Sequence, residues 1–239
     1  MSMKILITIC GRKGSKGIPG KNTKLLAGKP LVEYTISTAK KFAKNKDCVI
    51  GLSTDCENII QTAADCGITT SYKRPGILAG DTAGKIDVIA DLVKFEEEER
   101  GTTFDYIIDL DITSPLRTVI DLESALQAID DDTHALNIFS VNKANRNPYF
   151  NMVEQDGSGY YNLCKHGEFF TRQSAPKVYE LNASFYIFRR LFFEQGLTKA
   201  ITTSSLIYEM PHTCFDLDHP LDFEFMSFLV ENQKLDFLV

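Results

Sequence analysis

The chain has 239 residues, of which 44% are apolar and 24% charged, and its formal net charge is −6. This size and composition are typical of a soluble globular protein with one sizeable core. The acidic balance argues against a nucleic-acid binder with a broad basic face, and no apolar run approaches the ~20 residues of a membrane span.

Short β-rich apolar runs alternate with amphipathic stretches along the chain, which is typical of βα units around a mainly parallel sheet. The runs that predict strands are 4–10, 48–53, 106–110, 136–141 and 184–189. The stretches that predict helices are 30–44, 57–66, 85–100, 121–129 and 221–231. Pro30 suits a first helical turn, and Asp55 is a candidate cap for the second helix. We therefore expect a single α/β domain over residues 1–239.

A glycine-rich basic loop, GRKGSKGIPGKN, follows the first predicted strand from Gly11 to Asn22. Glycines allow the backbone to approach phosphate oxygens, and cations neutralise them. No acidic residue occurs before Glu33, and the six basic residues of this region are Arg12, Lys13, Lys16, Lys21, Lys24 and Lys29. The spacing is neither that of a P-loop nor G-x-G-x-x-G, so the loop predicts a nucleotide triphosphate site of another type.

Two acidic pairs occur in DLD triplets, Asp109 with Asp111 and Asp216 with Asp218. Residues i and i+2 of an extended strand share a face, so each pair could direct two carboxylates at one cation. Mg²⁺ suits such a site, because it takes a few carboxylate oxygens and fills its other positions with phosphate and water. Together with the basic loop, the pairs predict metal-assisted phosphoryl or nucleotidyl transfer.

The βα rhythm is interrupted at about 143–182, where Asp156 to Gly159 form a turn signal between alternating residues. This predicts an inserted β-hairpin. Its aromatic residues, of a kind that packs subunit interfaces, are Tyr149, Phe150, Tyr160, Tyr161, Phe169 and Phe170. Composition leaves open whether they contact a second subunit or their own domain.

The six cysteines are scattered, and no C-x-x-C pair occurs. This argues against a zinc ribbon or a thioredoxin-type site and fits thiols in a reducing cytoplasm.

Five motifs together resemble those of the CMP-sialic acid synthetases, or acylneuraminate cytidylyltransferases. The motifs are RxGSKGIPxKN from Arg12, KRPxxLAxDTA from Lys73, TSPLR from Thr113, RQxxPxxYxxNASFYIF from Arg172 and DLDHPLDF from Asp216. The resemblance implies transfer of CMP from CTP to the anomeric hydroxyl of a nine-carbon 2-keto sugar acid, with release of pyrophosphate and dependence on Mg²⁺. It also implies a Rossmann-like, three-layer nucleotidyltransferase fold and a homodimer with a β-rich dimerisation arm. Charge, hydropathy and the scattered cysteines predict a cytoplasmic protein with no nucleic-acid or membrane partner.

The same resemblance assigns roles to individual residues. Those that it places in the CTP-binding loop are Arg12, Ser15, Lys16, Lys21 and Asn22. Arg12 and Lys21 are expected on the phosphates and Arg74 near the cytosine. Asp216 and Asp218 match the metal pair, with Asp218 the more direct ligand. Arg172 and Gln173 match positions that bind the sugar acid.

Three departures from the sialic acid enzymes bear on the acceptor. Asp111 replaces a glutamine that faces the sugar, Gly84 and Lys85 replace small hydroxyl residues, and Phe150 replaces a lysine of the arm. Legionaminic or pseudaminic acid is therefore an alternative to N-acetylneuraminate, and Asp111 could contact either sugar or metal. More distant alternatives are an Asp-x-Asp glycosyltransferase and a non-catalytic nucleotide-binding protein.

Overall fold

Six strands form one sheet, in the order β10-β6-β9-β5-β1-β4, in the computed structural model, which describes residues 2–14 and 17–237. The strands are β1 (Lys4–Gly11), β4 (Asp47–Thr54), β5 (Tyr106–Leu110), β6 (Asn137–Lys143), β9 (Tyr179–Arg189) and β10 (Ser205–Glu209). β1 is parallel to β4 and β5, and β6 is parallel to β10. β9 is antiparallel to both of its neighbours, β5 and β6, so it is the reversed strand of an otherwise parallel sheet.

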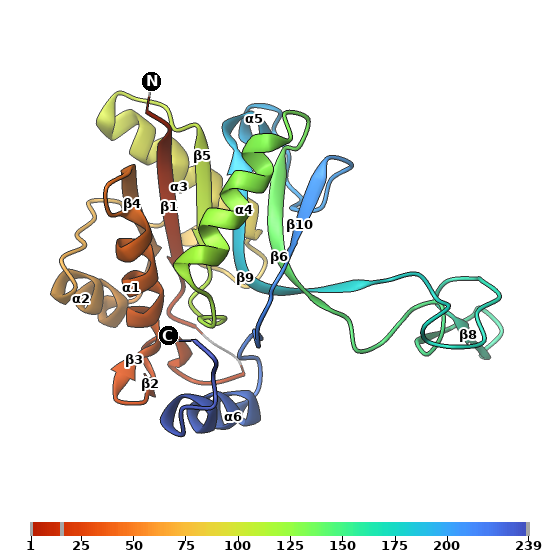
Figure 1. The fold of residues 1–239 in the computed structure, drawn as a ribbon. Coiled ribbons are helices and arrows are strands. Elements are labelled where there is room, and N and C mark those ends of the chain that lie inside the picture. Colours follow the sequence, from red (N-terminus) through yellow and green to blue (C-terminus); the bar gives the residue numbers. More distant parts are fainter. Residues whose placement is uncertain (1, 15–16, 238–239) are drawn as a thin grey trace.

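Helices cover both faces of this sheet (Figure 1). They are α1 (Leu31–Ala43), α2 (Glu57–Asp65), α3 (Lys85–Arg100), α4 (Val119–Asp131), α5 (Arg190–Glu194) and α6 (Pro220–Glu231). Side chains alternate along β1, so that Ile5, Ile7 and Ile9 pack with the cluster of α1, α2, α4 and α6. Leu6 packs with α3 and α5 on the opposite face. The expected three-layer α/β fold is confirmed.

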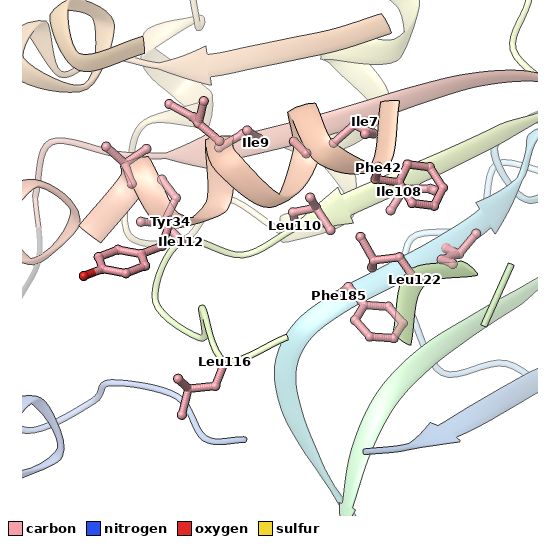
Figure 2. Close-up of a cluster of buried hydrophobic side chains, with 14 of the residues drawn as sticks. Ile7, Ile9, Tyr34, Phe42, Ile108, Leu110, Ile112, Leu116, Leu122 and Phe185 are labelled. Atoms are coloured by element: carbon pink, nitrogen blue, oxygen red, sulfur yellow. The ribbon is translucent and has the colours of Figure 1, made fainter. Parts of the chain in front are cut away.

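The larger of the two cores is built from the inward faces of β1, β5 and β9 and the apolar stripes of α1 and α4 (Figure 2). Full burial of one isoleucine, leucine or phenylalanine side chain contributes about 1.5–3 kcal/mol to the stability of the fold. Members that are at most 1% exposed include Ile7, Ile9, Phe42, Ile108, Leu110, Leu122 and Phe185. This core fixes the ends of β1 and β5, from which the loops of the site emerge.

Most predicted elements are confirmed, but α5 and a short ribbon at residues 25–30 were not predicted, and three further corrections follow. β10 was not predicted, because it is a five-residue edge strand of mixed burial. Pro30 precedes the first residue of α1 instead of opening its first turn. Asp55 does not cap α2, whose N-cap is Cys56 without a side-chain hydrogen bond. Asp55 Oδ1 instead accepts a hydrogen bond of 2.7 Å from the backbone N–H of Lys13, within the basic loop.

A long excursion between β6 and β9 extends away from the sheet (Figure 1). It carries the predicted β-hairpin, in which β7 (Val153–Gln155) pairs antiparallel with β8 (Tyr161–Leu163). Three of its aromatic side chains are largely exposed: Tyr160 (75%), Tyr161 (65%) and Phe170 (90%). The hairpin is confirmed, and its role in dimerisation remains a prediction.

Short elements complete the described chain. β2 (Leu25–Leu26) and β3 (Lys29–Pro30) form a small antiparallel ribbon, and the 3-10 turns η1 (Lys21–Thr23) and η2 (Gly76–Leu78) lie in loops. Within residues 2–14 and 17–237, no helix combines the length and apolar character needed to cross a membrane.

An ion pair joins His212 to the amino end of α4. His212 Nε2 lies 2.9 Å from Asp121 Oδ2, and the Tyr208 hydroxyl donates to Asp121 Oδ1 at 3.1 Å. Burial lowers the pKa of His212, but the hydrogen bonds of the ring to Asp121 and to the Thr213 carbonyl oxygen, together with the charges of Asp121 and Asp236, outweigh burial and raise that pKa above its ordinary value. Burial likewise raises the pKa of Asp121, and its bonds to His212 and Thr118 outweigh it and lower that pKa. Both shifts favour the charged pair.

The stabilising effect of His212 should therefore depend on pH. A raised histidine pKa gives stability that is complete below the unfolded pKa, ~6.5, and is lost as pH rises through the folded value. We expect His212→Gln to lower the melting temperature more at about pH 6 than at about pH 9. Exposed His134 provides the control, since a substitution at an exposed position, His134→Gln, should have little effect on the melting temperature. An equal loss at both pH values for His212→Gln would contradict the charged pair.

Candidate active site

The basic loop leaves the carboxyl end of β1 and returns to the sheet through η1. Gly17 is required by close approach, because a Cβ there would overlap the carbonyl oxygen of Asp218. Gly20 has a φ of +65°, which favours glycine. The loop is thus packed directly against the second DLD triplet. Ligands of open α/β sheets bind at this edge.

A pocket of about 350 Å³ lies between the loop, the end of β5 and the second DLD triplet. Its described lining residues are Cys10, Arg12, Gly14, Gly17, Lys21, Asn22, Asp111, Thr113 and Asp218. Five residues that the sequence singled out, Arg12, Lys21, Asn22, Asp111 and Asp218, therefore share one pocket. Ser15 and Lys16, assigned to the same loop, lie outside the described residues.

The two positively charged side chains that line the pocket, Lys21 and Arg12, are bound by neighbouring groups of the protein. The Lys21 side chain is 13% exposed, and its ammonium donates to the carbonyl oxygen of Leu217 and lies 4.0 Å from Asp218 Oδ1. Arg12 forms an ion pair with Asp81. Asn22 Nδ2 donates to the carbonyl oxygen of Arg12 at 3.2 Å. These contacts place Lys21 beside the open carboxylate of Asp218, whereas Arg12 lines the same pocket and is paired with Asp81.

The second DLD triplet presents one exposed and one half-buried carboxylate. The side chain of Asp218 is 70% exposed, and its backbone N–H donates to Asp222 Oδ2 at 2.9 Å. Asp216 does not line the pocket, and its Oδ1 accepts from the backbone N–H of Leu217 at 2.7 Å. Burial, and then the charge of Asp111, raises the pKa of Asp216.

Both carboxylates of the first DLD triplet form ion pairs with a lysine of the same chain. Lys85 Nζ lies 3.2 Å from Asp109 Oδ2 and 2.7 Å from Asp111 Oδ2. The two carboxylates share the α3 face of the sheet, as their i, i+2 spacing predicts. The sequence motifs give no role to Lys85, although this position departs from the sialic acid enzymes.

Arg74 lies in the loop between α2 and η2, and its side chain contacts the end of β4, on the far side of β1 from Asp111. Its Nε donates to Ser53 Oγ at 2.9 Å, and its Nη2 donates to the Ser53 carbonyl oxygen at 2.7 Å. It does not line the 350 Å³ pocket. Its proposed place near the base remains a prediction.

Arg172 and Gln173 line a different cavity, of about 510 Å³, at the base of the arm. Arg172 Nη2 donates to the carbonyl oxygens of Ala144 and Asn145, at 3.3 and 3.0 Å. One chain alone therefore does not bring the two predicted sugar-binding groups, Arg172 and Asp111, into one pocket.

Arg117 is the last residue of the TSPLR motif, and the motif alone predicts no role for it. The residue is buried, with 1% of its surface exposed. Its guanidinium donates to Thr35 Oγ1 at 2.7 Å and to the carbonyl oxygens of Asp111, Ser114 and Ser184, at 2.8, 2.7 and 2.7 Å. It joins the loop after β5 to α1 and β9, and so supports the pocket wall that carries Asp111.

The sheet, the glycine-rich basic loop at its carboxyl edge and the acidic residues across the pocket define a nucleotidyltransferase-type α/β enzyme. The family model described as "Cytidylyltransferase" matches residues 6–235, and the chain belongs to the cytidylyltransferase family. This confirms the family resemblance and the class of enzyme that the sequence predicts.

Individual proteins extend this comparison. The post-translational flagellin modification protein B of Campylobacter coli is 40% identical over 97% of both chains. The CMP-N,N'-diacetyllegionaminic acid synthase of Campylobacter jejuni is 36% identical, again over 97% of both. Among solved structures, a CMP:2-keto-3-deoxy-manno-octonic acid synthetase complexed with CTP has a TM-score of 0.67 at 18% identity and covers 97% of this chain and 100% of its own. At 18% identity, the likeness to this solved structure shows a shared fold.

Lys21 should matter far more to activity than the other lysines of the loop region. We expect Lys21→Ala to lower turnover by about 10²-fold, the usual cost of losing one preorganised donor at a developing charge. Lys29→Ala is the matched control, because Lys29 is exposed and does not line the pocket. Steady-state kinetics and melting temperatures would be measured together. Equal activity losses at both positions would indicate a diffuse electrostatic effect instead of a defined contact.

Proposed function

We propose that the chain transfers CMP from CTP to the anomeric hydroxyl of a nine-carbon 2-keto sugar acid and releases pyrophosphate. The observation that carries this proposal is the pocket at the carboxyl edge of the sheet that is lined by Arg12, Lys21 and Asp218, with Lys21 4.0 Å from Asp218. Membership of the cytidylyltransferase family supports CTP as the donor. The relative named CMP-N,N'-diacetyllegionaminic acid synthase supports a nonulosonic acid as the acceptor.

Among nonulosonic acids, a legionaminic-type acid is the acceptor that we favour over N-acetylneuraminate. Two observations support this choice. The legionaminic acid synthase of Campylobacter jejuni matches the chain over 97% of both lengths. Asp111, at the pocket wall, replaces the glutamine of the sialic acid enzymes, and an anionic carboxylate there would read different substituents from a neutral amide.

The residues of the pocket would act by binding and charge stabilisation. Lys21 is anchored through the Leu217 carbonyl and retains N–H groups for phosphate oxygens. Arg12 stands on the same pocket wall. Both would offset the charge that develops on the α-phosphate and on the leaving pyrophosphate. The sugar hydroxyl attacks the α-phosphorus directly, so the reaction requires no protein nucleophile.

The second DLD triplet fits a Mg²⁺ ion. Asp216 and Asp218 supply carboxylate oxygens, and the raised pKa of Asp216 reflects burial beside other negative charges. Two carboxylates suit Mg²⁺, because this ion takes most of its other ligands from phosphate and water. Mg²⁺ bound there would neutralise charge on the triphosphate.

We also propose that the enzyme works as a cytoplasmic homodimer in which the arm reaches the second subunit. The exposed aromatic side chains of the arm and the separation of Arg172 from Asp111 support this arrangement, because a second chain could complete the sugar site. The six cysteines are free thiols, as suits a reducing compartment.

Pyrophosphate release tests the proposed reaction. The protein would be mixed with Mg²⁺, one of the four nucleoside triphosphates and one of three acids: N-acetylneuraminate, di-N-acetyllegionaminate or pseudaminate. We expect release with CTP, fastest with the legionaminate, and loss of release on chelation of the metal. Absence of release with every acid would overturn the proposed function. A wide preference for N-acetylneuraminate would overturn only the acceptor.

A further inference from the structure

Lys85, Asp109 and Asp111 form a charged group beside the pocket, which Asp111 lines, and this group is called here the Lys85 triad. Lys85 is the first residue of α3, Asp109 lies on β5, and Asp111 directly follows that strand. Their side chains are 36%, 1% and 19% exposed, in that order. The lysine is therefore the member of the triad that is most open to a ligand.

Hydrogen bonds occupy every carboxylate oxygen of the triad. Asp109 Oδ1 accepts from Thr8 Oγ1 at 2.8 Å, and Asp111 Oδ1 accepts from both the backbone N–H and the hydroxyl of Thr113, at 2.9 Å each. The two remaining oxygens, both Oδ2, accept from Lys85 Nζ. An ammonium has three N–H groups, so one donor of Lys85 is left over after these two bonds.

The triad is a fixed arrangement of charges. Burial lowers the pKa of Lys85, but the charges of Asp111 and Asp109 outweigh it and raise that pKa well above its ordinary value. For Asp111, burial raises the pKa, whereas Lys85 and Thr113 outweigh it and lower the pKa to about 2. One cation and two anions give the triad a net charge of −1. This negative charge repels a carboxylate group of the substrate and favours a neutral oxygen as the partner of the remaining Lys85 N–H.

The order of strands places the triad on one side of the basic loop. Along the carboxyl edge come β4, where Arg74 binds Ser53, then β1 with the loop, then β5 with the triad. The next strand, β9, carries Tyr186, whose ring centroid is 4.9 Å from Lys85 Nζ. β9 and β6 continue into the arm. With CTP running from Arg74 to the loop, the triad lies where the acceptor would approach.

We propose that Lys85 is an acceptor-binding and specificity-determining residue, whose remaining N–H donates to a neutral oxygen of the sugar acid, a hydroxyl or an acyl-amino carbonyl. Asp109 and Asp111 position its ammonium. This inference rests on the proposed function, and it shifts the sugar contact on this wall from the carboxylate of Asp111 to the lysine that Asp111 holds.

Two variants test the role of Lys85. Lys85→Met removes the donor but leaves Asp109 and Asp111 without their shared cation. Lys85→Met combined with Asp109→Asn removes the donor and keeps the net charge of −1, so the net charge beside CTP is unchanged. Lys94→Met is the matched control on the same helix, since Lys94 is 75% exposed and pairs only loosely with Glu98, at 3.8 Å.

Steady-state kinetics of pyrophosphate release would give separate KM values for CTP and for di-N-acetyllegionaminate. We expect the double variant to raise the sugar KM by about tenfold or more, as is typical for loss of a charged hydrogen bond, and to leave the CTP KM within about twofold. Lys94→Met should change neither value. Melting temperatures would be measured for all variants. If Lys85→Met does not fold, the double variant alone tests the role of Lys85.

Several results would overturn the proposal. One is a CTP KM that rises as much as the sugar KM in the double variant, which would assign Lys85 to the nucleotide. Another is a lower melting temperature with both KM values unchanged, which would make the triad structural. Turnover by the unmodified protein of at least one acid in the panel tests the proposed function separately, so the two failures are distinguishable.

Discussion

Asp218→Asn is expected to lower turnover by about 10²-fold or more while the fold is retained. Loss of a carboxylate that holds a metal against a triphosphate costs several kcal/mol of transition-state stabilisation, and each ~1.4 kcal/mol is a factor of ten in rate. The structure explains why the fold should survive. The Asp218 side chain is 70% exposed, and its backbone N–H, bonded to Asp222, is unchanged by the substitution.

Comparison with two other variants sharpens this test. Asp216→Asn should be milder, because Asp216 does not line the pocket. Glu224→Gln, at an exposed position of α6, removes a carboxylate from the same region and should leave turnover unchanged. Turnover would be measured over a range of Mg²⁺ concentrations. Near-normal turnover of Asp218→Asn at saturating Mg²⁺ would remove Asp218 from the metal site.

Local sequence patterns were sufficient for the layers of the fold. The bounds of α3 and β5 agree with the predicted ranges 85–100 and 106–110, because apolar spacing decides both elements over short distances. β10 escaped prediction, since its burial comes from pairing with β6, which is 68 positions earlier at Asn137 and Ser205. Pairing partners so distant leave no local periodic signal.

The site was predictable where a motif carries its chemistry and not where a contact is long-range. Arg12 and Lys21 stand out as cations in a glycine-rich loop. The triad does not stand out, because Lys85 and Asp111 are 26 positions apart and meet only when α3 covers the same face of the sheet as Asp109. Arg117 is hidden for another reason, since arginine is rarely fully buried and a pattern-based reading assigns it to the surface.

Arg117 ties together three parts of the structure that support the pocket. Its guanidinium is buried without a carboxylate partner within the described chain, and burial lowers its pKa to about 10, so it remains charged at neutral pH. Carbonyl oxygens and the Thr35 hydroxyl take the place of a counter-ion. Each carbonyl has a second donor: the Ser184 hydroxyl for Ser114, the Thr35 hydroxyl for Asp111 and the Asp111 N–H for Ser184. Loss of Arg117 would therefore remove one hydrogen bond from each of these three carbonyl oxygens, and each oxygen would keep its second donor.

We expect Arg117→Ala to lower the free energy of unfolding by about 3–5 kcal/mol, from the cavity that it opens and the hydrogen bonds that it removes. Arg117→Met, which fills most of the volume, should cost about 1–3 kcal/mol, and the difference between the two measures the cavity. Arg146→Ala, at an exposed position, should stay within about 0.5 kcal/mol. Chemical denaturation would give all three values. A loss for Arg117→Ala no larger than that of Arg146→Ala would show that the buried guanidinium adds nothing to stability, and that the wall carrying Asp111 is held by its other contacts.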